Sequence, residues 1–190
     1  MDNEEIFVGG VVVPLVVPIL DDDGSIDFEG LEILVEWLVN NGVNGLFVAG
    51  TTGRASYFTA RENANICRTV SKVAKGRVTV YAGCLDSGIR RILENSEMMA
   101  NAGADILVTT LPYYLSYSVY EAQCDLERII VKISVPVILF NIPELVRISM
   151  EPAWVAEMAE HENIVGYKDS SGDINHLLEV LRLTKDKDFK

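Results

Sequence analysis

The sequence predicts an α/β protein built on a parallel sheet, and three observations support that prediction. Short apolar or β-branched runs alternate six times with amphipathic segments. The repeat is roughly 30 residues long, which is the size of one βαβ unit. Similar sequences containing Asn and Gly precede two of the runs, and no linker interrupts the series. Such alternation is typical of parallel strands covered by helices.

Three strand–helix pairs are predicted in the first half of the chain. The first strand is β-branched, and the helix after it has apolar residues at helical spacing and ends at Gly42. Thr59 and Glu62 form a capping box for the next helix. Ser87 is predicted to cap the third helix, which Gly103 ends. In order, these elements span residues 11–17, 27–41, 45–49, 59–74, 78–82 and 87–101.

The second half of the chain follows the same plan. A strand leads into a loop rich in tyrosine, and Ser118 with Glu121 forms a second capping box. Pro152 suits the first turn of the following helix. Lys168 closes the sixth strand. In order, the predicted elements are a strand at 105–109, a helix at 118–133, a strand at 137–140, a helix from 152, a strand at 164–168 and a helix at 173–183.

The bulk composition fits one folded domain over residues 1–190. Hydrophobic residues make up 49% and charged residues 23% of the chain, which is enough for a sizeable core. The net charge of −12 argues against nucleic acid or an anionic membrane as a partner, because both favour a basic surface. The longest apolar run, residues 11–20, contains two prolines and is too short to span a bilayer.

Neither the cysteines nor the histidines show the spacing of a metal site. Cys67, Cys84 and Cys124 are odd in number and widely separated, so we expect small core residues rather than disulfides. His161 and His176 have no ligand spacing and are predicted to lie on helix surfaces. The acidic start of the chain does not look like a secretory signal. We therefore expect a cytoplasmic protein without a metal or another cofactor.

Lys168 is the first candidate for chemistry. Lysine is rarely fully buried without a partner or a function. Burial can lower its pKa by several units, which gives the neutral amine that Schiff-base chemistry requires. The alternative is that Lys168 caps its strand, reaches solvent and pairs with Asp169 or Asp173.

Two architectures fit the alternation, an open doubly wound sheet and a (β/α)₈ barrel. The first strand is not followed by G-x-G-x-x-G, which weakens the dinucleotide-binding version of the open sheet. In a barrel, the loops after the strands face one mouth. The residues after strands two, four, five and six are Thr-Thr, Tyr-Tyr, Asn-Ile-Pro and Lys, a set that could converge there.

Several short motifs carry a resemblance to a known family. They are Pro18 with D-G-S-I-D at 23–27, G-T-T-G at 50–53, P-Y-Y at 112–114, N-I-P at 141–143 and G-Y-K-D at 166–169. In this order, the motifs resemble the pyruvate-dependent class I aldolases, which include dihydrodipicolinate synthase and N-acetylneuraminate lyase. The resemblance covers nearly the whole chain. It implies a (β/α)₈ TIM barrel, of which this chain would carry the first six βα units and be truncated at its C-terminal end.

The resemblance implies a role for each matching residue. Lys168 would form a Schiff base with pyruvate or another small 2-oxo acid, and Tyr114 would reach across a dimer interface into a neighbouring site. The substrate-binding loop would comprise Gly50, Thr51, Thr52 and Gly53. The two threonines would bind the substrate carboxylate, for which a loop that opens onto a helix offers donors; their alternative role is helix capping. The glycines would allow close backbone approach.

Several residues depart from the family pattern, including Val17 and Ile19, which flank Pro18 where the family usually has Thr-Pro-Phe. Phe140 stands where the family has a tyrosine that relays protons, and loss of such a group typically costs 10²- to 10⁴-fold in rate. Arg54 replaces a glutamate and would either bind an acidic or phosphorylated substrate tail or pair with Glu62. Leu145 replaces an arginine of the dihydrodipicolinate synthases, and Arg147 stands where glycine is common.

The resemblance therefore implies a carbon–carbon lyase. The expected reaction is aldol cleavage or condensation of pyruvate and a 2-oxo acid such as a 2-keto-3-deoxy sugar acid. The alternatives are a condensing enzyme like dihydrodipicolinate synthase, and a catalytically impaired paralogue that binds a small oxo acid or a partner chain. A homo-oligomer, either a dimer or a tetramer, is expected from the same resemblance.

Overall fold

The structure is a computed structural model that describes residues 9–21 and 23–190. It divides into two compact units. The first unit runs to Gly83 and includes Glu97–Leu107, and the second comprises Cys84–Ser96 and Val108–Lys190. The acidic start of the chain and Asp22 lie outside the described residues.

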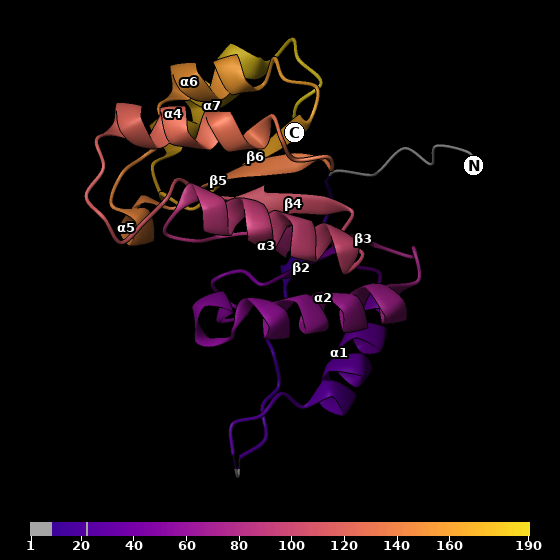
Figure 1. The fold of residues 1–190 in the computed structure, drawn as a ribbon. Helices are drawn as coiled ribbons and strands as arrows, with labels where there is room; N and C mark the ends of the chain where they lie inside the picture. Colours follow the sequence, from indigo (N-terminus) through magenta and orange to yellow (C-terminus); the bar gives the residue numbers. More distant parts are fainter. Residues whose placement is uncertain (1–8, 22) are drawn as a thin grey trace. The chain divides into compact units, whose positions relative to one another are not determined.

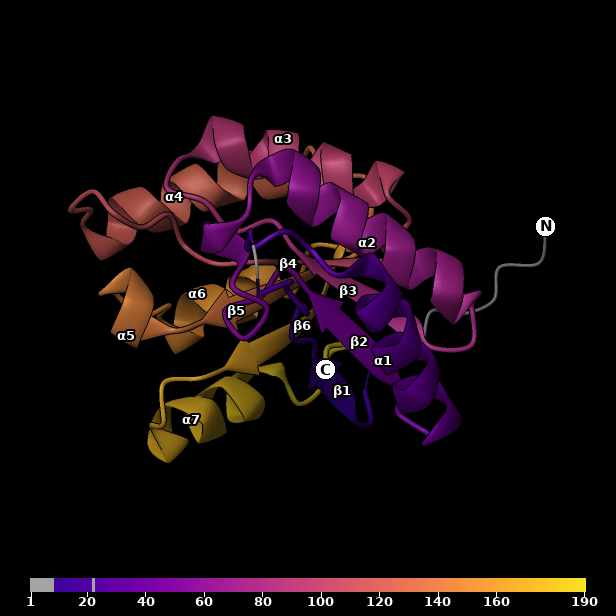
Figure 2. The same ribbon diagram turned by 90° about the horizontal axis from the view of Figure 1, so that it is seen from below.

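Parallel strands and two long helices build the first unit (Figure 1). The pairing is parallel throughout, with Val13 opposite Leu46 and Leu46 opposite Val80. Helices α1 and α2 lie side by side in both views of the ribbon (Figures 1 and 2). The elements are β1 (Val12–Pro14), α1 (Phe28–Asn40), β2 (Gly45–Val48), the 3₁₀ helix η1 (Ala55–Tyr57), α2 (Ala60–Ala74) and β3 (Thr79–Gly83).

The helices of the first unit begin where side chains satisfy their free backbone N–H groups. The Asp27 carboxylate accepts a hydrogen bond from the N–H of Gly30 at 2.9 Å. The predicted capping box of Thr59 and Glu62 is present at the start of α2. Both helices bury an apolar face, which consists of Leu31, Val35 and Leu38 on α1 and of Ile66, Cys67 and Val70 on α2. Local sequence signals and core packing therefore agree in this unit.

Two elements, α3 (Ile89–Asn101) and β4 (Ile106–Thr109), contribute residues to both units. The remaining elements of the second unit are α4 (Val119–Ile130), β5 (Val137–Asn141), α5 (Pro143–Val146), α6 (Pro152–Met158), β6 (Ile164–Asp169) and α7 (Ile174–Thr184). Strands β5 and β6 are parallel, and the last residue, Lys190, also pairs with β6. Its N–H donates to the carbonyl of Val165 at 3.1 Å, and its carbonyl accepts from the N–H of Tyr167 at 2.8 Å.

The strands are neighbours in chain order from β1 to β6, which is the order of a barrel, one of the two architectures that the alternation left open. The capping box of Ser118 and Glu121 is also present. Three details differ. The strand predicted at 11–17 is shorter and comprises only Val12–Pro14, although the N–H of Leu15 still donates to the carbonyl of Phe47 at 2.9 Å. Ser87 does not cap α3; its hydroxyl donates to Asp86 at 3.2 Å. The short helices η1 and α5 were not expected.

The cysteines behave as predicted for core residues. Cys67 and Cys84 are buried free thiols, and Cys124 is half-buried and also free. Burial raises the pKa of Cys67 to about 12, so its thiol stays protonated at neutral pH. Within the described residues, no cluster of three or more His, Cys, Asp or Glu side chains could hold a metal ion.

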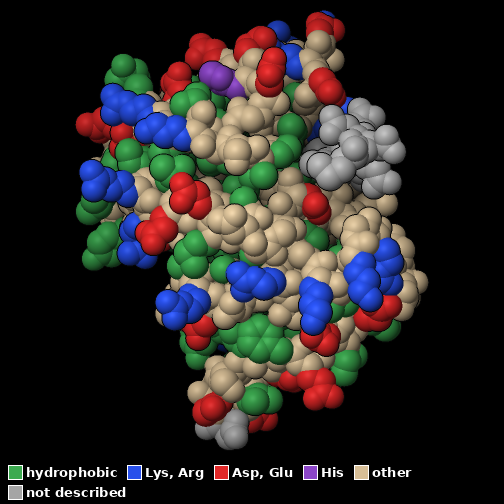
Figure 3. Space-filling model, turned by 45° about the vertical axis from the view of Figure 1, so that its right-hand side comes forward, with side chains coloured by type: hydrophobic (Ala, Val, Ile, Leu, Met, Phe, Trp, Pro, Cys, Tyr) green, Lys and Arg blue, Asp and Glu red, His purple; other side chains and the backbone are tan. Residues whose placement is uncertain are grey.

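The surface carries charges of both signs. On the face drawn in Figure 3, Lys and Arg side chains are interspersed with Asp and Glu side chains. No helix among the described residues has both the length and the apolar character needed to cross a membrane.

Candidate active site

Lys168 lies beside Phe140 in the second unit. The two residues are partners in the register of β5 and β6. The Lys168 Nζ atom lies over the aromatic ring, 3.5 Å from its centroid. Phe140 is 1% exposed, whereas Lys168 is half-buried. The lysine is the second-last residue of β6 rather than the last, because Asp169 also belongs to the strand.

Burial sets the protonation state of this amine. It disfavours the charged form and lowers the pKa of Lys168 to about 8. The face of the Phe140 ring attracts an ammonium group and so opposes this effect. With a pKa of about 8, about half of the Lys168 amine is neutral at pH 8. The neutral form is the one that attacks a carbonyl carbon.

Side chains on either side of Lys168 form a polar network on the opposite face of the strand, because side chains alternate along a strand. The hydroxyl of Tyr167 donates to Asp169 Oδ2 at 2.8 Å and lies 2.9 Å from His176 Nε2. Burial and the nearby Asp169 carboxylate raise the pKa of Tyr167, which keeps this hydroxyl protonated. His176 is 13% exposed, so the prediction of a surface position is wrong for this residue. His176 lies on the side of α7 that faces β6, where its ring contacts the Tyr167 hydroxyl.

Asn141 connects the ends of β5 and β6. Its side-chain N–H₂ donates to Asp169 Oδ2 and to Ser149 Oγ, both at 3.1 Å. Its side-chain carbonyl accepts from the N–H of Met150 at 3.0 Å. Burial raises the pKa of Asp169, but hydrogen bonds from Ser171, Asn141 and Tyr167 outweigh it and hold that pKa below its ordinary value. Asp169, the residue next to Lys168, is therefore held in place as an ionised carboxylate.

We expect Asn141→Ala to lower the free energy of unfolding by about 1–3 kcal/mol, because it leaves buried hydrogen-bonding groups without a partner. Asn141 is 1% exposed, so water cannot easily replace its amide. The measurement is urea unfolding followed by circular dichroism. Asn175→Ala is the matched control, since Asn175 is exposed and we expect a change within about 0.5 kcal/mol. Equal effects of the two substitutions would contradict the anchoring role.

The predicted substrate-binding residues form one tight loop in the first unit. The N–H of Arg54 donates to the carbonyl of Thr51 at 3.0 Å, and that of Ala55 to the carbonyl of Gly50 at 3.1 Å. A Cβ on Gly50 would lie 2.7 Å from the Phe47 ring, and one on Gly53 would lie 2.8 Å from the Leu15 carbonyl. Protein atoms thus fill the space beside both glycines.

The hydroxyl-bearing part of this loop is accessible. Thr51 and Thr52 are both exposed, and neither caps α2, whose N-cap is Thr59. The Glu62 carboxylate accepts from the N–H and the hydroxyl of Thr59, each at 2.7 Å. Within residues 9–21 and 23–190, no ion pair joins Arg54 to Glu62, so the predicted pair is not formed.

A pocket of about 370 Å³ adjoins the same loop. Its apolar walls come from residues 16–19 and Phe58. Its polar walls come from Thr52, Arg54 and Tyr57. All of these residues belong to the first unit.

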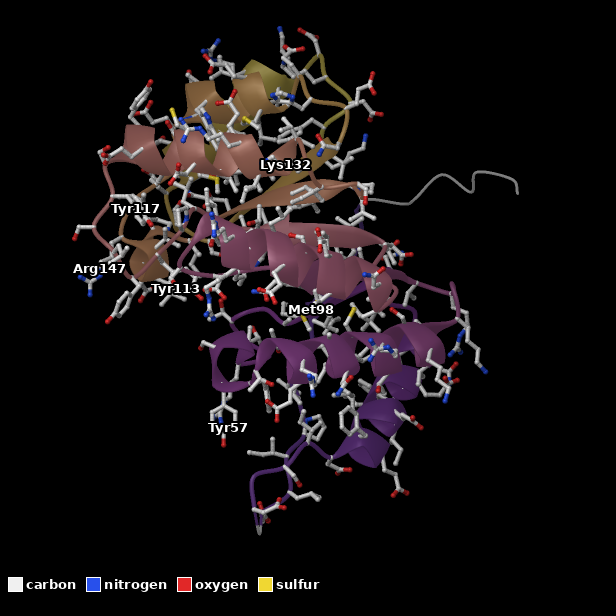
Figure 4. The ribbon with its side chains drawn as sticks, in the orientation of Figure 1. Tyr57, Met98, Tyr113, Tyr117, Lys132 and Arg147 are labelled. Carbon is white, nitrogen blue, oxygen red and sulfur yellow. The ribbon has the colours of Figure 1, made fainter. Side chains whose placement is uncertain are left out.

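Aromatic and basic side chains gather around α5 in the second unit. Figure 4 shows Tyr113, Tyr117 and Arg147 at this end of the unit. Tyr114, in the same loop after β4, is 91% exposed with a φ of 82°. Arg147 ends α5 with a φ of 69°, a left-handed conformation that favours glycine. Burial and the nearby Asp86 raise the pKa of Tyr113.

The structure therefore brings Lys168 and Phe140 into contact and forms a continuous loop from Gly50 to Arg54. The network of Tyr167, Asp169 and His176 was missed. Strand alternation already indicated that Tyr167 and Asp169 share the face opposite Lys168. His176 joins this network only because of the way α7 packs near β6, which the sequence does not show.

These features define a class of protein: a parallel α/β protein with a half-buried lysine near the end of its sixth strand. The chain belongs to the dihydrodipicolinate synthetase family, whose sequence model matches residues 7–189. A curated relative is the 4-hydroxy-tetrahydrodipicolinate synthase of Thermoanaerobacter sp. (strain X514), which is 34% identical over 92% of this chain and 58% of the relative. The family expected from the motifs is confirmed.

Solved structures of members of this family are also similar to this chain. A dihydrodipicolinate synthase from Bacillus anthracis superposes with a TM-score of 0.90 at 30% identity, covering 96% of this chain and 62% of the other. The enzyme from Acinetobacter baumannii, solved in complex with pyruvate, has a TM-score of 0.88 at 30% identity, with coverages of 93% and 60%. A prophage protein of the family from E. coli K12, also in complex with pyruvate, has a TM-score of 0.85 at 32% identity, with coverages of 92% and 59%.

These comparisons confirm the predicted fold class. The six parallel strands, in chain order, are those of a partial (β/α)₈ barrel. The chain spans about three fifths of the length of the relatives it matches.

Proposed function

We propose that the protein is a class I aldolase or lyase that acts through a Schiff base on Lys168. The observation that carries this proposal is the half-buried Lys168 amine, whose pKa of about 8 supplies a neutral nucleophile near neutral pH. The pyruvate complexes of the Acinetobacter baumannii enzyme and the E. coli protein support pyruvate as the keto substrate.

The proposed reaction begins when neutral Lys168 attacks the keto carbon. A C–N bond forms, the keto oxygen leaves as water with both protons of the amine, and uptake of one further proton from solvent gives a protonated imine. The imine withdraws electrons, so the neighbouring carbon loses a proton and becomes an enamine. The enamine then forms a C–C bond to an aldehyde, or the reverse sequence breaks one. Phe140 has no hydroxyl to move these protons, so water, Thr52 or Tyr114 would have to do so.

The other site residues have proposed roles that suit their positions. The exposed Thr51 and Thr52 hydroxyls would bind the carboxylate of the 2-oxo acid. Tyr114 is almost fully exposed, which suits a side chain that enters the site of a partner subunit in a homodimer or tetramer. We further propose that the chain belongs to one barrel domain, and that the protein is cytoplasmic, in keeping with its free thiols.

Leu145 bears on the class of substrate. Leu145 is 54% exposed on α5 and offers no charge to a second carboxylate, which favours a 2-keto-3-deoxy sugar acid. The alternative is a condensing enzyme like the 4-hydroxy-tetrahydrodipicolinate synthases at 34% identity. A third candidate is an impaired paralogue that only binds an oxo acid or a partner chain, which the buried Phe140 favours because its ring has no acid.

Reductive trapping tests the proposal directly. The protein is incubated with pyruvate and borohydride, and its intact mass is measured. A gain of one reduced pyruvate, mapped by peptide sequencing to Lys168, is the expected result. No gain in mass would reject the Schiff-base proposal and favour the impaired paralogue.

The pH dependence of trapping gives a second, independent test. Because the Lys168 pKa is lowered to about 8, the neutral amine fraction should rise about tenfold between pH 6 and pH 7 and level off above about pH 9. The measurement is the initial rate of adduct formation with cyanoborohydride at saturating pyruvate. A rate that still rises steeply beyond pH 10 would indicate a lysine with an ordinary pKa and would contradict the burial argument.

A further inference from the structure

We propose that a network of hydrogen bonds on the face of β6 opposite Lys168 positions this lysine against the Phe140 ring. This inference rests on the proposed Schiff-base function and adds residues that act through Lys168. All of them belong to the second unit. This strand-end network consists of Asn141 of β5, Tyr167 and Asp169 of β6, Ser171 of the following turn and His176 of α7.

The Asp169 carboxylate is the centre of the strand-end network. Its Oδ2 atom accepts from the Tyr167 hydroxyl at 2.8 Å and from the Asn141 amide at 3.1 Å. Its Oδ1 atom accepts from the N–H of Ser171 at 2.8 Å and from the hydroxyl of Ser171 at 2.6 Å. The Asp169 side chain is only 7% exposed, so water cannot easily replace these donors. The carboxylate therefore joins the ends of β5 and β6 to the turn after them.

His176 adds α7 to the same network. Its Nε2 atom lies 2.9 Å from the Tyr167 hydroxyl and 4.0 Å from Asp169 Oδ2. The Tyr167 hydroxyl donates its proton to Asp169, so the His176 ring has to donate to the tyrosine oxygen, which places a proton on Nε2. Figure 2 shows α7 alongside β6. Two strands and a helix are thus tied together beside Lys168.

Lys168 lies in β6 between two anchored residues. Because side chains alternate along a strand, Tyr167 and Asp169 both face away from the lysine amine. The N–H of Ser170 donates to the carbonyl of Asn141 at 2.8 Å, which continues the pairing of β5 and β6 past Lys168. Segments held by few contacts open locally at low cost in free energy. The strand-end network therefore keeps Lys168 within the sheet and gives its flexible side chain a fixed origin.

The position of the amine determines its reactivity. The Lys168 Nζ atom lies 3.5 Å from the centroid of the buried Phe140 ring, and burial lowers the Lys168 pKa to about 8. If the end of β6 frayed, water would stabilise the ammonium form and the pKa would rise. A pKa of about 9 would lower the neutral fraction at pH 7 about tenfold. The network thus maintains the nucleophile without any contact to substrate.

Competitive labelling tests the proposal without turnover. Trace acetic anhydride, which reacts with the neutral amine, is added at a series of pH values from about 6 to 11. Acetylation of Lys168 is measured by peptide mass spectrometry relative to the exposed Lys132. We expect Asp169→Ala to raise the Lys168 pKa read from this profile and to slow its labelling at pH 7 by about 3- to 10-fold. Asp169→Asn keeps one oxygen that can accept and should give a smaller change.

The direction of the pKa change separates positioning from a simple effect of charge. Removal of a nearby negative charge disfavours an ammonium group and would lower the Lys168 pKa. Loss of position raises it. Tyr167→Phe keeps the ring and the charge of Asp169 but removes the hydroxyl that joins His176 to the carboxylate, and it should also raise the Lys168 pKa. A lower or unchanged Lys168 pKa in the folded variants would overturn the proposal.

A control at the other end of β6 accounts for general loss of stability. Asn163 immediately precedes the strand. Its side-chain N–H₂ donates to the carbonyls of Ile130 at 2.8 Å and Ile133 at 3.4 Å. Asn163→Ala should therefore destabilise the protein but leave the labelling profile of Lys168 unchanged. A rise in the Lys168 pKa as large as that in Asp169→Ala would contradict a specific role for the strand-end network.

Pyruvate trapping connects the network to the proposed reaction. In Asp169→Ala, adduct formation on Lys168 should be slow at pH 7 and should recover above about pH 9, because the neutral amine is then restored. An equal loss at every pH would indicate a structural defect and would overturn the positioning role. Absence of the adduct in the wild-type protein would instead reject the Schiff-base function, and the labelling profiles would still decide whether the network positions Lys168.

Discussion

Replacing Lys168 with alanine should abolish the reduced pyruvate adduct and all aldol activity. In the proposed reaction the imine forms on the ε-amine of Lys168, and no water or neighbouring hydroxyl can replace that covalent bond. Lys168→Met keeps the apolar length of the side chain against the Phe140 ring and should abolish the adduct equally. Intact mass after trapping is the primary measurement, and pyruvate consumption is the second.

The control is another lysine of the same unit. Lys132, labelled in Figure 4, follows α4 and is exposed, whereas Lys168 is half-buried. Lys132→Ala should therefore trap pyruvate like the wild-type protein. Circular dichroism and thermal unfolding of each variant show whether the fold is retained. A well-folded Lys168→Ala protein that still gains one reduced pyruvate would reject the proposed site.

Patterns that depend on local physics were predictable from the sequence. Capping boxes at Thr59 and Ser118 require only a hydroxyl and a glutamate three residues apart, and both are present as predicted. The alternation of strands and helices predicted a parallel sheet, and the strands pair in parallel. Of the two alternatives that the sequence left open for Lys168, the structure supports burial, which lowers the pKa of its amine.

Features that depend on tertiary packing were not predictable from the sequence. His176 has the sequence context of a surface helix residue, and only the packing of α7 brings it within 2.9 Å of Tyr167. Arg54 and Glu62 stand at a plausible spacing for an ion pair. The capping box captures Glu62 instead, because its two hydrogen bonds to Thr59 are local and cost little chain entropy.

Backbone conformations in the left-handed region were also not predictable from the sequence. Arg54 and Arg147 have φ values of 52° and 69°, although arginine does not favour this region. The loop and the end of α5 require that conformation irrespective of the residue. Sequence propensity therefore gives no signal of it at these two positions.

Phe140→Tyr should raise the rate of the proposed reaction by about 10²- to 10⁴-fold, provided that the site is otherwise competent. The ring already lies 3.5 Å from Lys168 Nζ, so a hydroxyl on it would be close to the atoms that gain and lose protons. The measurement is kcat for pyruvate-dependent aldol turnover at saturating acceptor. Phe140→Leu is the matched control, because it removes the ring without adding an acid and should give no increase.

The outcome of this substitution separates two explanations for Phe140. Phe140 is 1% exposed, so a tyrosine hydroxyl at this position needs a hydrogen-bond partner or it will destabilise the protein. If the rate rises, the site lacks only its proton relay and the wild-type protein is a slow enzyme. If the rate is unchanged while the pyruvate adduct still forms on Lys168, another group already moves the protons, and the presence of phenylalanine does not limit turnover. If the adduct forms but neither protein turns over, Lys168 captures an oxo acid without completing the aldol step, which is the behaviour expected of the impaired paralogue.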